Sequence, residues 1–229
     1  MPASLRLQES TVARLYYDGM SKDLFVTGTD TGVGKTLVSA LLCAALEGVY
    51  WKPIQTGASE DSDRRTVMEL AGLSAERTIP ECYVFDPPVS PHLAAEWAGT
   101  TIDLATIRLP EGRLPGPLIA EGAGGVMVPV NGSEFMLDMM GRLGLPVVVV
   151  ARSALGTINH SVLTVRALQA SGLAVKGVVM VGTPNADNER AVERYGPAPI
   201  IGRVPLLEVI NREVLLEVYH REFNKSVFD

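Results

Sequence analysis

The feature that most constrains this chain is the glycine-rich loop that follows its first apolar run, Asp23–Val26. The loop reads Thr-Gly-Thr-Asp-Thr-Gly-Val-Gly-Lys-Thr over residues 27–36, and an Ala/Leu-rich stretch of helical length, Leu37–Leu46, comes directly after it. Strand, glycine-rich loop and helix in this order are typical of a phosphate-binding loop. Inward-facing backbone N–H groups and the N-terminus of the helix together hold an anion there. The sequence therefore predicts a nucleotide phosphate site at this turn.

Individual residues of the loop have distinct expected roles. Gly32 and Gly34 let the backbone turn its N–H groups inward without obstruction by a Cβ atom. Lys35 is expected to reach the β- and γ-phosphates, and the hydroxyl of Thr36 is expected to hold Mg²⁺. The glycine usually found five positions before the Gly-Lys pair stands one residue earlier here, at Gly28. An ordinary glycine-rich turn between strand and helix remains the alternative interpretation.

Composition excludes several classes of protein. The chain has 229 residues, of which 47% are hydrophobic and 20% charged, so it is long enough and apolar enough for one folded α/β domain. A net charge of -6 argues against a nucleic-acid or membrane-surface binder, because both use a basic face. Two cysteines without paired spacing, Cys43 and Cys82, argue against a disulfide framework or a zinc site. No apolar run approaches the ~18 residues of a membrane span, and we expect a cytoplasmic protein.

The N-terminus lacks the apolar core of a signal peptide and has no clear amphipathic period. Met20 would be a natural start, since it places the phosphate loop close to the N-terminus. We therefore expect residues 1–20 to be an extension without catalytic role, and residues 21–229 to form the domain.

Strand-like and helix-like segments alternate from Leu24 onward. This alternation predicts a single-domain, doubly wound α/β fold of the P-loop NTPase type, with a mostly parallel sheet and helices on both faces. The expected strands are Asp23–Val26, Val49–Ile54, Cys82–Phe85, Pro117–Gly125, Leu145–Val150, Leu173–Val181 and Pro199–Val204. The expected helices are Leu37–Leu46, Thr66–Leu73, Ser90–Trp97, Leu104–Arg113 (helix or turn), Ser133–Gly141, His160–Ala170, Asn185–Tyr195 and Pro205–Tyr219.

Charged residues stand where strands are expected to end, which is where ligands bind in open α/β sheets. Lys52 comes near the end of one such strand, with an edge lysine as the alternative. Glu121 lies in the Pro117–Gly125 strand, where an ionised carboxylate needs a partner. Magnesium beside a triphosphate is an apt partner, because Mg²⁺ prefers one or two carboxylates plus phosphate; a glutamate capping the next turn is the alternative.

Asp61 and Asp63 are expected in a polar turn, and His92 is interpreted as structural.

A second anion site is expected where the segment Leu155–His160 opens a helix. Exposed N–H groups at a helix start suit a carboxylate. The simpler interpretation is that Thr157 or Asn159 is an N-cap.

Residues 28–36 resemble the phosphate loop of the dethiobiotin synthetase family throughout their length. Five further motifs of that family have similar counterparts in the same order, together spanning Leu24 to about Pro205. They are Lys52–Gly57, Ser62–Asp63, Ser90–His92, Glu121–Gly125 and Leu155–His160.

The resemblance implies ATP- and Mg²⁺-dependent closure of a cyclic urea in biotin biosynthesis. The implied substrates are 7,8-diaminononanoate, carbon dioxide and ATP, and the products are dethiobiotin, ADP and phosphate. One amine would form a carbamate, the carbamate a carbamic-phosphoric anhydride, and the second amine would close the ring.

The resemblance also implies roles for residues at matching positions. Lys52 and Lys35 would be catalytic, and Thr36, Asp63 and Glu121 would gather Mg²⁺. The implied ATP-binding residues are Gly32, Val33, Gly34, Lys35, Thr36, Leu37, Asp63, Glu121, Gly122, Ala123, Gly124, Pro205, Leu206 and Leu207. The implied substrate-binding residues are Thr56, Gly156, Thr157, Ile158 and Asn159. The last four would come from a partner subunit, so a homodimer is implied.

The chain departs from the family at the adenine end. Val181 and Gly182 stand where family members often have Asn-Asp, and Arg203 stands where an acidic residue is expected, so the preference for ATP stays open. Two rivals share the fold. A glutamine-dependent amidating synthetase needs a further glutaminase domain, and a partitioning-type switch ATPase needs a second lysine where this chain has Thr29.

Overall fold

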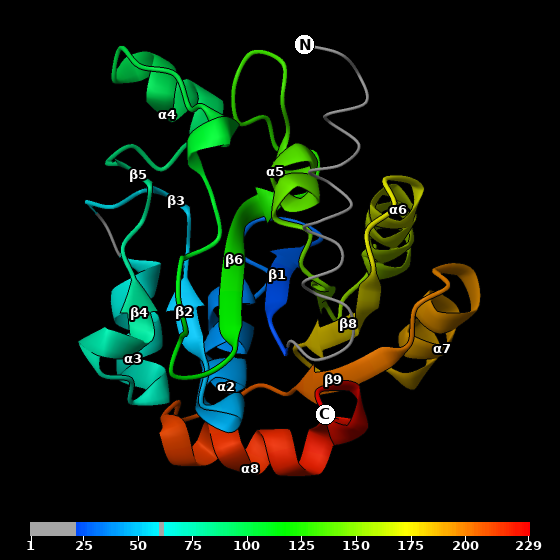
Figure 1. The fold of residues 1–229 in the computed structure, drawn as a ribbon. Helices are drawn as coiled ribbons and strands as arrows, with labels where there is room; N and C mark the ends of the chain where they lie inside the picture. The colour runs from blue at the N-terminus through cyan, green and yellow to red at the C-terminus, as the bar shows by residue number, and fades with distance from the viewer. Residues whose placement is uncertain (1–21, 60–61) are drawn as a thin grey trace.

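The structure is a computed structural model that describes residues 22–59 and 62–229 of the chain. The expected N-terminal extension and Asp61 therefore lie outside the described residues. A seven-stranded sheet forms the centre of the molecule (Figure 1). Across the described ranges, no helix has the length and apolar character needed to cross a membrane.

All neighbouring strands of the central sheet run parallel. Their spatial order is β4-β2-β6-β1-β7-β8-β9. The strands are β1 (Leu24–Gly28), β2 (Val49–Trp51), β4 (Thr78–Ile79), β6 (Leu118–Gly125), β7 (Val147–Arg152), β8 (Val175–Val181) and β9 (Ile200–Val204). The predicted doubly wound α/β fold is confirmed.

Helices cover both faces of this sheet. On one face lie α2 (Lys35–Leu46), α3 (Asp63–Ala71) and α8 (Arg212–Glu222), the last along the bottom of Figure 1. The other face packs against α5 (Met136–Leu143), α6 (Thr157–Ala170) and α7 (Ala186–Tyr195). Strand β7 shows why two cores form. Val148 and Val150 belong to one cluster, while Val147, Val149 and Ala151 belong to the other, because successive side chains of a strand point to opposite faces.

The strand order creates a crevice at the carboxyl end of β1. This strand lies between β6 and β7, and the chain leaves it toward β2 on one side and later builds β7, β8 and β9 on the other. Open α/β sheets bind ligands at such a switch point. The loop that follows β1 is the glycine-rich loop predicted to bind phosphate.

The expected strand Val49–Ile54 was wrong in its length. Strand β2 ends at Trp51, and the chain then forms β3 (Ile54–Thr56), which pairs with β5 (Tyr83–Phe85) in a separate two-stranded sheet. Pro53 lies at the break and has no N–H to donate to a sheet. Helix α4 (Pro91–Trp97) packs against β3 and β5. The central sheet is completed by β4, which follows the short 3₁₀ turn η1 (Ala75–Arg77).

Two predicted helices were wrong in extent. Residues 205–211 are not helical, and α8 begins at Arg212, where the side chain of Asn211 accepts a hydrogen bond from Val214 N. In the stretch 104–113 only the 3₁₀ turn η2 (Leu104–Thr106) forms, with Asp103 accepting from Ala105 N. The chain ends in the 3₁₀ turn η3 (Lys225–Val227).

Three helices begin at a different residue from the one that the sequence predicted, and in each case the residue at the N-cap position explains the difference. Helix α3 begins at Asp63, not Thr66, because Ser62 accepts from Arg65 N. Helix α5 begins at Met136. The backbone N–H of its N-cap residue, Phe135, donates to the carboxylate of Asp138. Helix α6 begins at Thr157 after Gly156, which has φ 94°, so neither Thr157 nor Asn159 is the N-cap.

Candidate functional site

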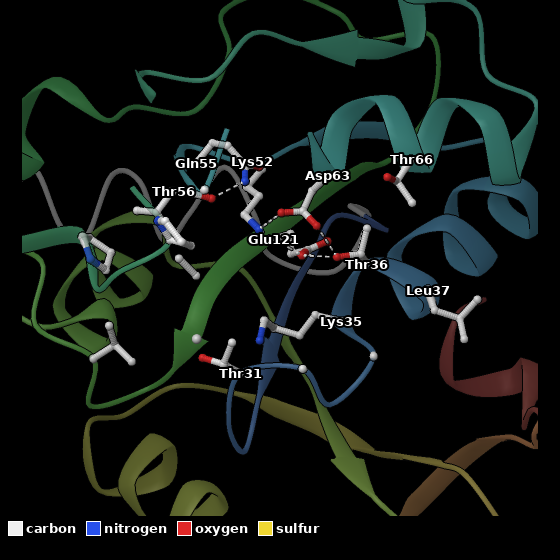
Figure 2. A pocket seen from close by; sticks show the side chains of 18 of the residues that line it. Thr31, Lys35, Thr36, Leu37, Lys52, Gln55, Thr56, Asp63, Thr66 and Glu121 are labelled. Carbon is white, nitrogen blue, oxygen red and sulfur yellow. Dashed lines mark hydrogen bonds and ion pairs between the residues drawn. The ribbon is translucent and has the colours of Figure 1, made fainter. Parts of the chain in front are cut away.

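A cavity of about 700 Å³ opens at the carboxyl ends of β1, β2 and β6 (Figure 2). Its lining combines the phosphate loop and the start of α2 with residues from five other segments. From the loop and α2 come Thr31, Gly32, Gly34, Lys35, Thr36 and Leu37, and from elsewhere Lys52, Gln55, Thr56, Asp63, Thr66, Ser90, Pro91, Glu121, Ala123, Gly124 and Ile210.

The loop has the conformation that its glycines allow. Gly32 and Gly34 have φ values of 67° and 99°, in the left-handed region. Gly28 is required for a different reason: a Cβ atom there would lie 2.7 Å from Val33 Cγ2 and 2.9 Å from Asp30 O. The unusual position of this glycine thus follows from the close packing of the loop on itself. The side chain of Val33, also in this loop, is buried and does not line the cavity.

Lys35 and the start of α2 give the loop its positive character. Among the residues that the structure describes, no side chain caps the N-terminus of α2, so its first N–H groups remain available to an anion. The Lys35 ammonium is buried and donates to Asp30 O at 2.9 Å. Burial lowers the pKa of Lys35, and the nearby Glu121 carboxylate opposes that change.

Four side chains meet at the floor of the cavity (Figure 2). The Thr36 hydroxyl lies 2.6 Å from Asp63 Oδ1 and 3.1 Å from Glu121 Oε1. The Lys52 ammonium forms ion pairs with both carboxylates, bonding Asp63 Oδ2 and lying 3.5 Å from Glu121 Oε1. The structure therefore brings together Thr36, Lys52, Asp63 and Glu121, which the sequence places on four separate elements or connections.

This cluster is charged although it is buried. Glu121 is 0% and Lys52 7% exposed. Burial alone would lower the pKa of Lys52, but the carboxylates of Glu121 and Asp63 outweigh burial, and the pKa is raised. Burial would likewise raise the pKa of Asp63, yet the neighbouring Lys52 ammonium holds that pKa below its usual value. Lys52 and Asp63 are thus both ionised at neutral pH.

Tyr50 supports this cluster and was missed by sequence reasoning. Its hydroxyl donates to Glu121 Oε2 at 3.0 Å, and burial raises its pKa far above the usual value, so it stays a donor. Tyr50 stands two residues before Lys52, and residues so spaced on a strand share a face. That spacing was the signal that could have found it.

The donor set at the cavity floor suits Mg²⁺. Two carboxylates and a hydroxyl offer only oxygen ligands, and Mg²⁺ is usually bound by one or two carboxylates together with phosphate oxygens. Within the part of the chain that the structure describes, no group of three or more His, Cys, Asp or Glu side chains could hold a metal without such help. These residues therefore fit a metal that arrives with a nucleotide.

The end of β6, after Glu121, closes one side of the cavity. Ala123 and Gly124 line it, and Gly124 has φ 67°. A Cβ atom at Gly124 would lie 2.7 Å from Val128 Cγ2, and one at Gly122 would lie 3.0 Å from the Phe25 ring. Gly124 thus lets this segment pack closely against Val128, and Gly122 lets it pack closely against the Phe25 ring.

Two predicted groups lie outside this cavity. Gly156, Thr157, Ile158 and Asn159 form the start of α6, and none of them lines it. Pro205, Leu206 and Leu207 do not line it either; of the segment 205–211 only Ile210 does. His92 Nδ1 and Ser90 Oγ share a hydrogen bond of 3.1 Å, which fits the structural role expected for His92.

Comparison with known proteins identifies the family. A family model described as an AAA domain matches residues 22–214. The chain is 48% identical over 194 residues to the ATP-dependent dethiobiotin synthetase BioD of Nitrobacter hamburgensis, covering 85% of this chain and 91% of that protein. It is 43% identical over 209 residues to the enzyme of the same name from Rhodopseudomonas palustris, covering 91% and 97%. It is 48% identical over 187 residues to that of Novosphingobium aromaticivorans, covering 82% and 89%. The chain is therefore an enzyme of the ATP-dependent dethiobiotin synthetase family.

Proposed function

We propose that this enzyme closes the ureido ring of dethiobiotin from 7,8-diaminononanoate and carbon dioxide, consuming ATP and releasing ADP and phosphate. The observation that carries the proposal is the contact of Lys52 with two carboxylates at the mouth of a phosphate loop. A phosphate loop alone would serve any nucleotide hydrolase. A buried lysine between that loop and an open cavity additionally offers a cation to a second, carboxylate-like reactant.

The reaction would proceed in three covalent steps. One amine of the substrate adds to carbon dioxide and loses a proton, which gives a carbamate. A carbamate oxygen attacks the γ-phosphorus and ADP leaves, which gives a carbamic-phosphoric anhydride. The second amine attacks the carbamate carbon and inorganic phosphate leaves, which closes the ring. Such chemistry depends mainly on positioning and on stabilisation of developing negative charge.

The phosphate loop and Lys35 would hold the triphosphate. The N-terminus of α2 has no side-chain cap among the described residues, and an anion binds favourably at such a helix start. Lys35 now donates to a carbonyl of its own loop. A phosphate oxygen is a better acceptor for an ammonium than a neutral carbonyl, so Lys35 would exchange one for the other. Ala123 and Gly124 would contact the nucleotide from the opposite wall.

Thr36, Asp63 and Glu121 would hold Mg²⁺, which supplies charge neutralisation on the β- and γ-phosphates when bound. The three oxygen ligands already converge, since Thr36 Oγ1 bonds to both carboxylates. Tyr50 fixes the far oxygen of Glu121 and so orients the near one.

Lys52 would stabilise the negative charge of the carbamate and of the transferring phosphoryl group. It is held in place by ion pairs, and its raised pKa keeps it charged at neutral pH. Thr56, on the same cavity wall, would contact the diamine. We also propose Pro205, Leu206 and Leu207 as contacts of the nucleotide base.

The start of α6 supports the proposed homodimer. Leu155 is fully exposed, and Met127 and Leu163 are 55% and 61% exposed. Met127 and Leu163 line a shallow, largely apolar hollow beside the phosphate loop. Burial of these side chains against a second copy would remove apolar surface from water and carry the N–H groups of residues 156–159 to the partner's cavity. Leu163→Glu should shift the protein to monomer in analytical ultracentrifugation, whereas an unchanged sedimentation coefficient would contradict this interface.

A cytoplasmic location stays a prediction.

Isotope incorporation tests the proposed reaction. Purified protein with diaminononanoate, ¹³C-bicarbonate, Mg²⁺ and ATP should give dethiobiotin that carries the label in its ureido carbon, as read by mass spectrometry. Unlabelled product, or no product with folded protein, would reject it.

A further inference from the structure

Gln55 is a buried side chain in the cavity wall to which neither the family motif nor the proposed reaction gives a role. It lies on β3 between Lys52 and Thr56, is 4% exposed, and lines the same cavity as both (Figure 2). A glutamine in such a position is unusual, because buried amides need partners at both ends.

The orientation of the Gln55 amide is set by its surroundings. Its Nε2 donates to Thr56 O at 2.7 Å. An oxygen at that end would face the oxygen of a carbonyl, so only the NH₂ group fits there. The carbonyl end of the amide therefore points away from Thr56 O.

That carbonyl oxygen has no hydrogen-bond partner within residues 22–59 and 62–229, although it is fully buried. A buried acceptor without a donor is destabilising, and an apolar side chain of similar size would avoid the loss. The choice of glutamine therefore indicates that a donor reaches this oxygen in another state of the enzyme.

Lys52 is a donor that must change partners. An ammonium has three N–H groups, and in the ligand-free protein Lys52 directs them to Asp63 and Glu121. These carboxylates are the proposed Mg²⁺ ligands, and a divalent cation would draw their oxygens away from the ammonium. Lys52 then needs other acceptors besides the reacting groups. Because the Gln55 oxygen is covered by protein, a donor that is already inside the cavity wall reaches it more readily than an entering molecule does.

We propose that Gln55 is a positioning residue for Lys52: its side-chain carbonyl accepts a hydrogen bond from the Lys52 ammonium in the loaded enzyme and fixes that ammonium toward the reacting groups. The inference rests on the proposed function of Lys52 in ring closure. It goes beyond that function by assigning a second position to the ammonium.

A double-mutant cycle on the full-length protein tests the proposal. Gln55→Met keeps the length of the side chain and removes the acceptor. It should lower kcat about tenfold, the effect typical of a lost hydrogen bond to a charged group, and leave KM for diaminononanoate and the dissociation constant of ADP unchanged. In a Lys52→Ala background the same substitution should cause no further loss, because the residue it positions is gone. Residual product in that background is measured by mass spectrometry over long incubations.

Gln169→Met is the matched control, since Gln169 is an exposed glutamine on α6; it should leave all three constants unchanged. If the loss of kcat in the Gln55→Met, Lys52→Ala double variant equals the product of the losses in the two single variants, the proposal is overturned. A raised KM for the diamine with unchanged kcat would also overturn it, because it would show that Gln55 contacts the substrate itself. Absence of wild-type turnover would instead reject the proposed function, and this assignment with it.

Discussion

Lys52 and Asp63 form an ion pair at the cavity floor, although one follows β2 and the other begins α3. The pair is largely shielded from water, and Glu121 provides a second carboxylate within 3.5 Å of the same ammonium. A lysine thus occupies, in the absence of ligand, the space between two groups suited to a divalent cation. The proposed catalytic cation and the proposed metal ligands thus neutralise one another's charge.

Lys52→Ala is expected to lower ring closure by about 100-fold or more, because it removes a preorganised charge aimed at the developing anion. ADP binding should remain near wild type, since the phosphate loop and Lys35 are untouched. Mg²⁺ should bind the nucleotide complex at least as tightly, because a competing ammonium has been removed. Product assays and isothermal titration calorimetry measure these quantities, with the exposed Lys22→Ala as control. Retained turnover in Lys52→Ala would remove Lys52 from the mechanism.

Glu121→Gln is expected to raise the Mg²⁺ concentration needed for half-maximal activity by at least about tenfold, because an amide is a much weaker ligand for a hard cation. The hydrogen bond from Tyr50 can persist to the amide oxygen, so folding should be preserved. A Mg²⁺ titration of phosphate release checks the shift. Glu134→Gln, at the exposed pair with Arg142, is the control. A titration curve identical to wild type would show that Glu121 is not a ligand.

Gly28→Ala is expected to abolish detectable nucleotide binding. The added methyl group would lie 2.7 Å from Val33 Cγ2 and 2.9 Å from a backbone oxygen, so the loop must shift. Gly141→Ala offers a matched control: Gly141 lies in α5, no atom of the described residues lies within 4 Å of the new Cβ atom, and the change should stabilise that helix by about 0.5–1 kcal/mol. Calorimetric ADP titration and thermal unfolding separate the two effects. Normal ADP affinity in Gly28→Ala would contradict the packing explanation.

Acid should weaken the folded state partly through Asp63. The folded-state pKa of Asp63 lies below its ordinary value of 3.8, chiefly because Lys52 offsets the effect of burial. The stabilisation from Asp63 is therefore present above pH 3.8 and is lost as the pH falls through the folded-state value. Urea unfolding free energies of wild type should fall more steeply in this range than those of Asp63→Asn, by at most about 1.4 kcal/mol per pH unit. Asp86→Asn is an exposed control. Parallel curves for wild type and Asp63→Asn would refute the expectation.

Sequence reasoning reached the fold and the neighbourhood of the site because both depend on local patterns. The order of strand, glycine loop and helix placed the phosphate loop, and alternation along the chain predicted a parallel sheet. Contacts between distant residues were out of reach: the spacing of Tyr50 and Lys52 could have placed both on one face, but it does not show that the Tyr50 hydroxyl meets Glu121, 71 positions later. Pro53 could have indicated that the strand does not continue beyond Trp51, so that β3 with Gln55 forms a separate cavity wall. The segment 205–211 was predicted as helix because apolar spacing does not reveal that a cap at Asn211 delays the start.

Measurement of phosphate release with each component omitted in turn tests the central claim most directly. Purified protein is mixed with diaminononanoate, bicarbonate, Mg²⁺ and ATP, and phosphate and dethiobiotin are followed together. The account predicts equal amounts of phosphate and dethiobiotin in the complete mixture, and neither above background when any one component is left out. Phosphate release that continues unchanged without diaminononanoate or bicarbonate would contradict it, because the cavity would then serve nucleotide hydrolysis alone.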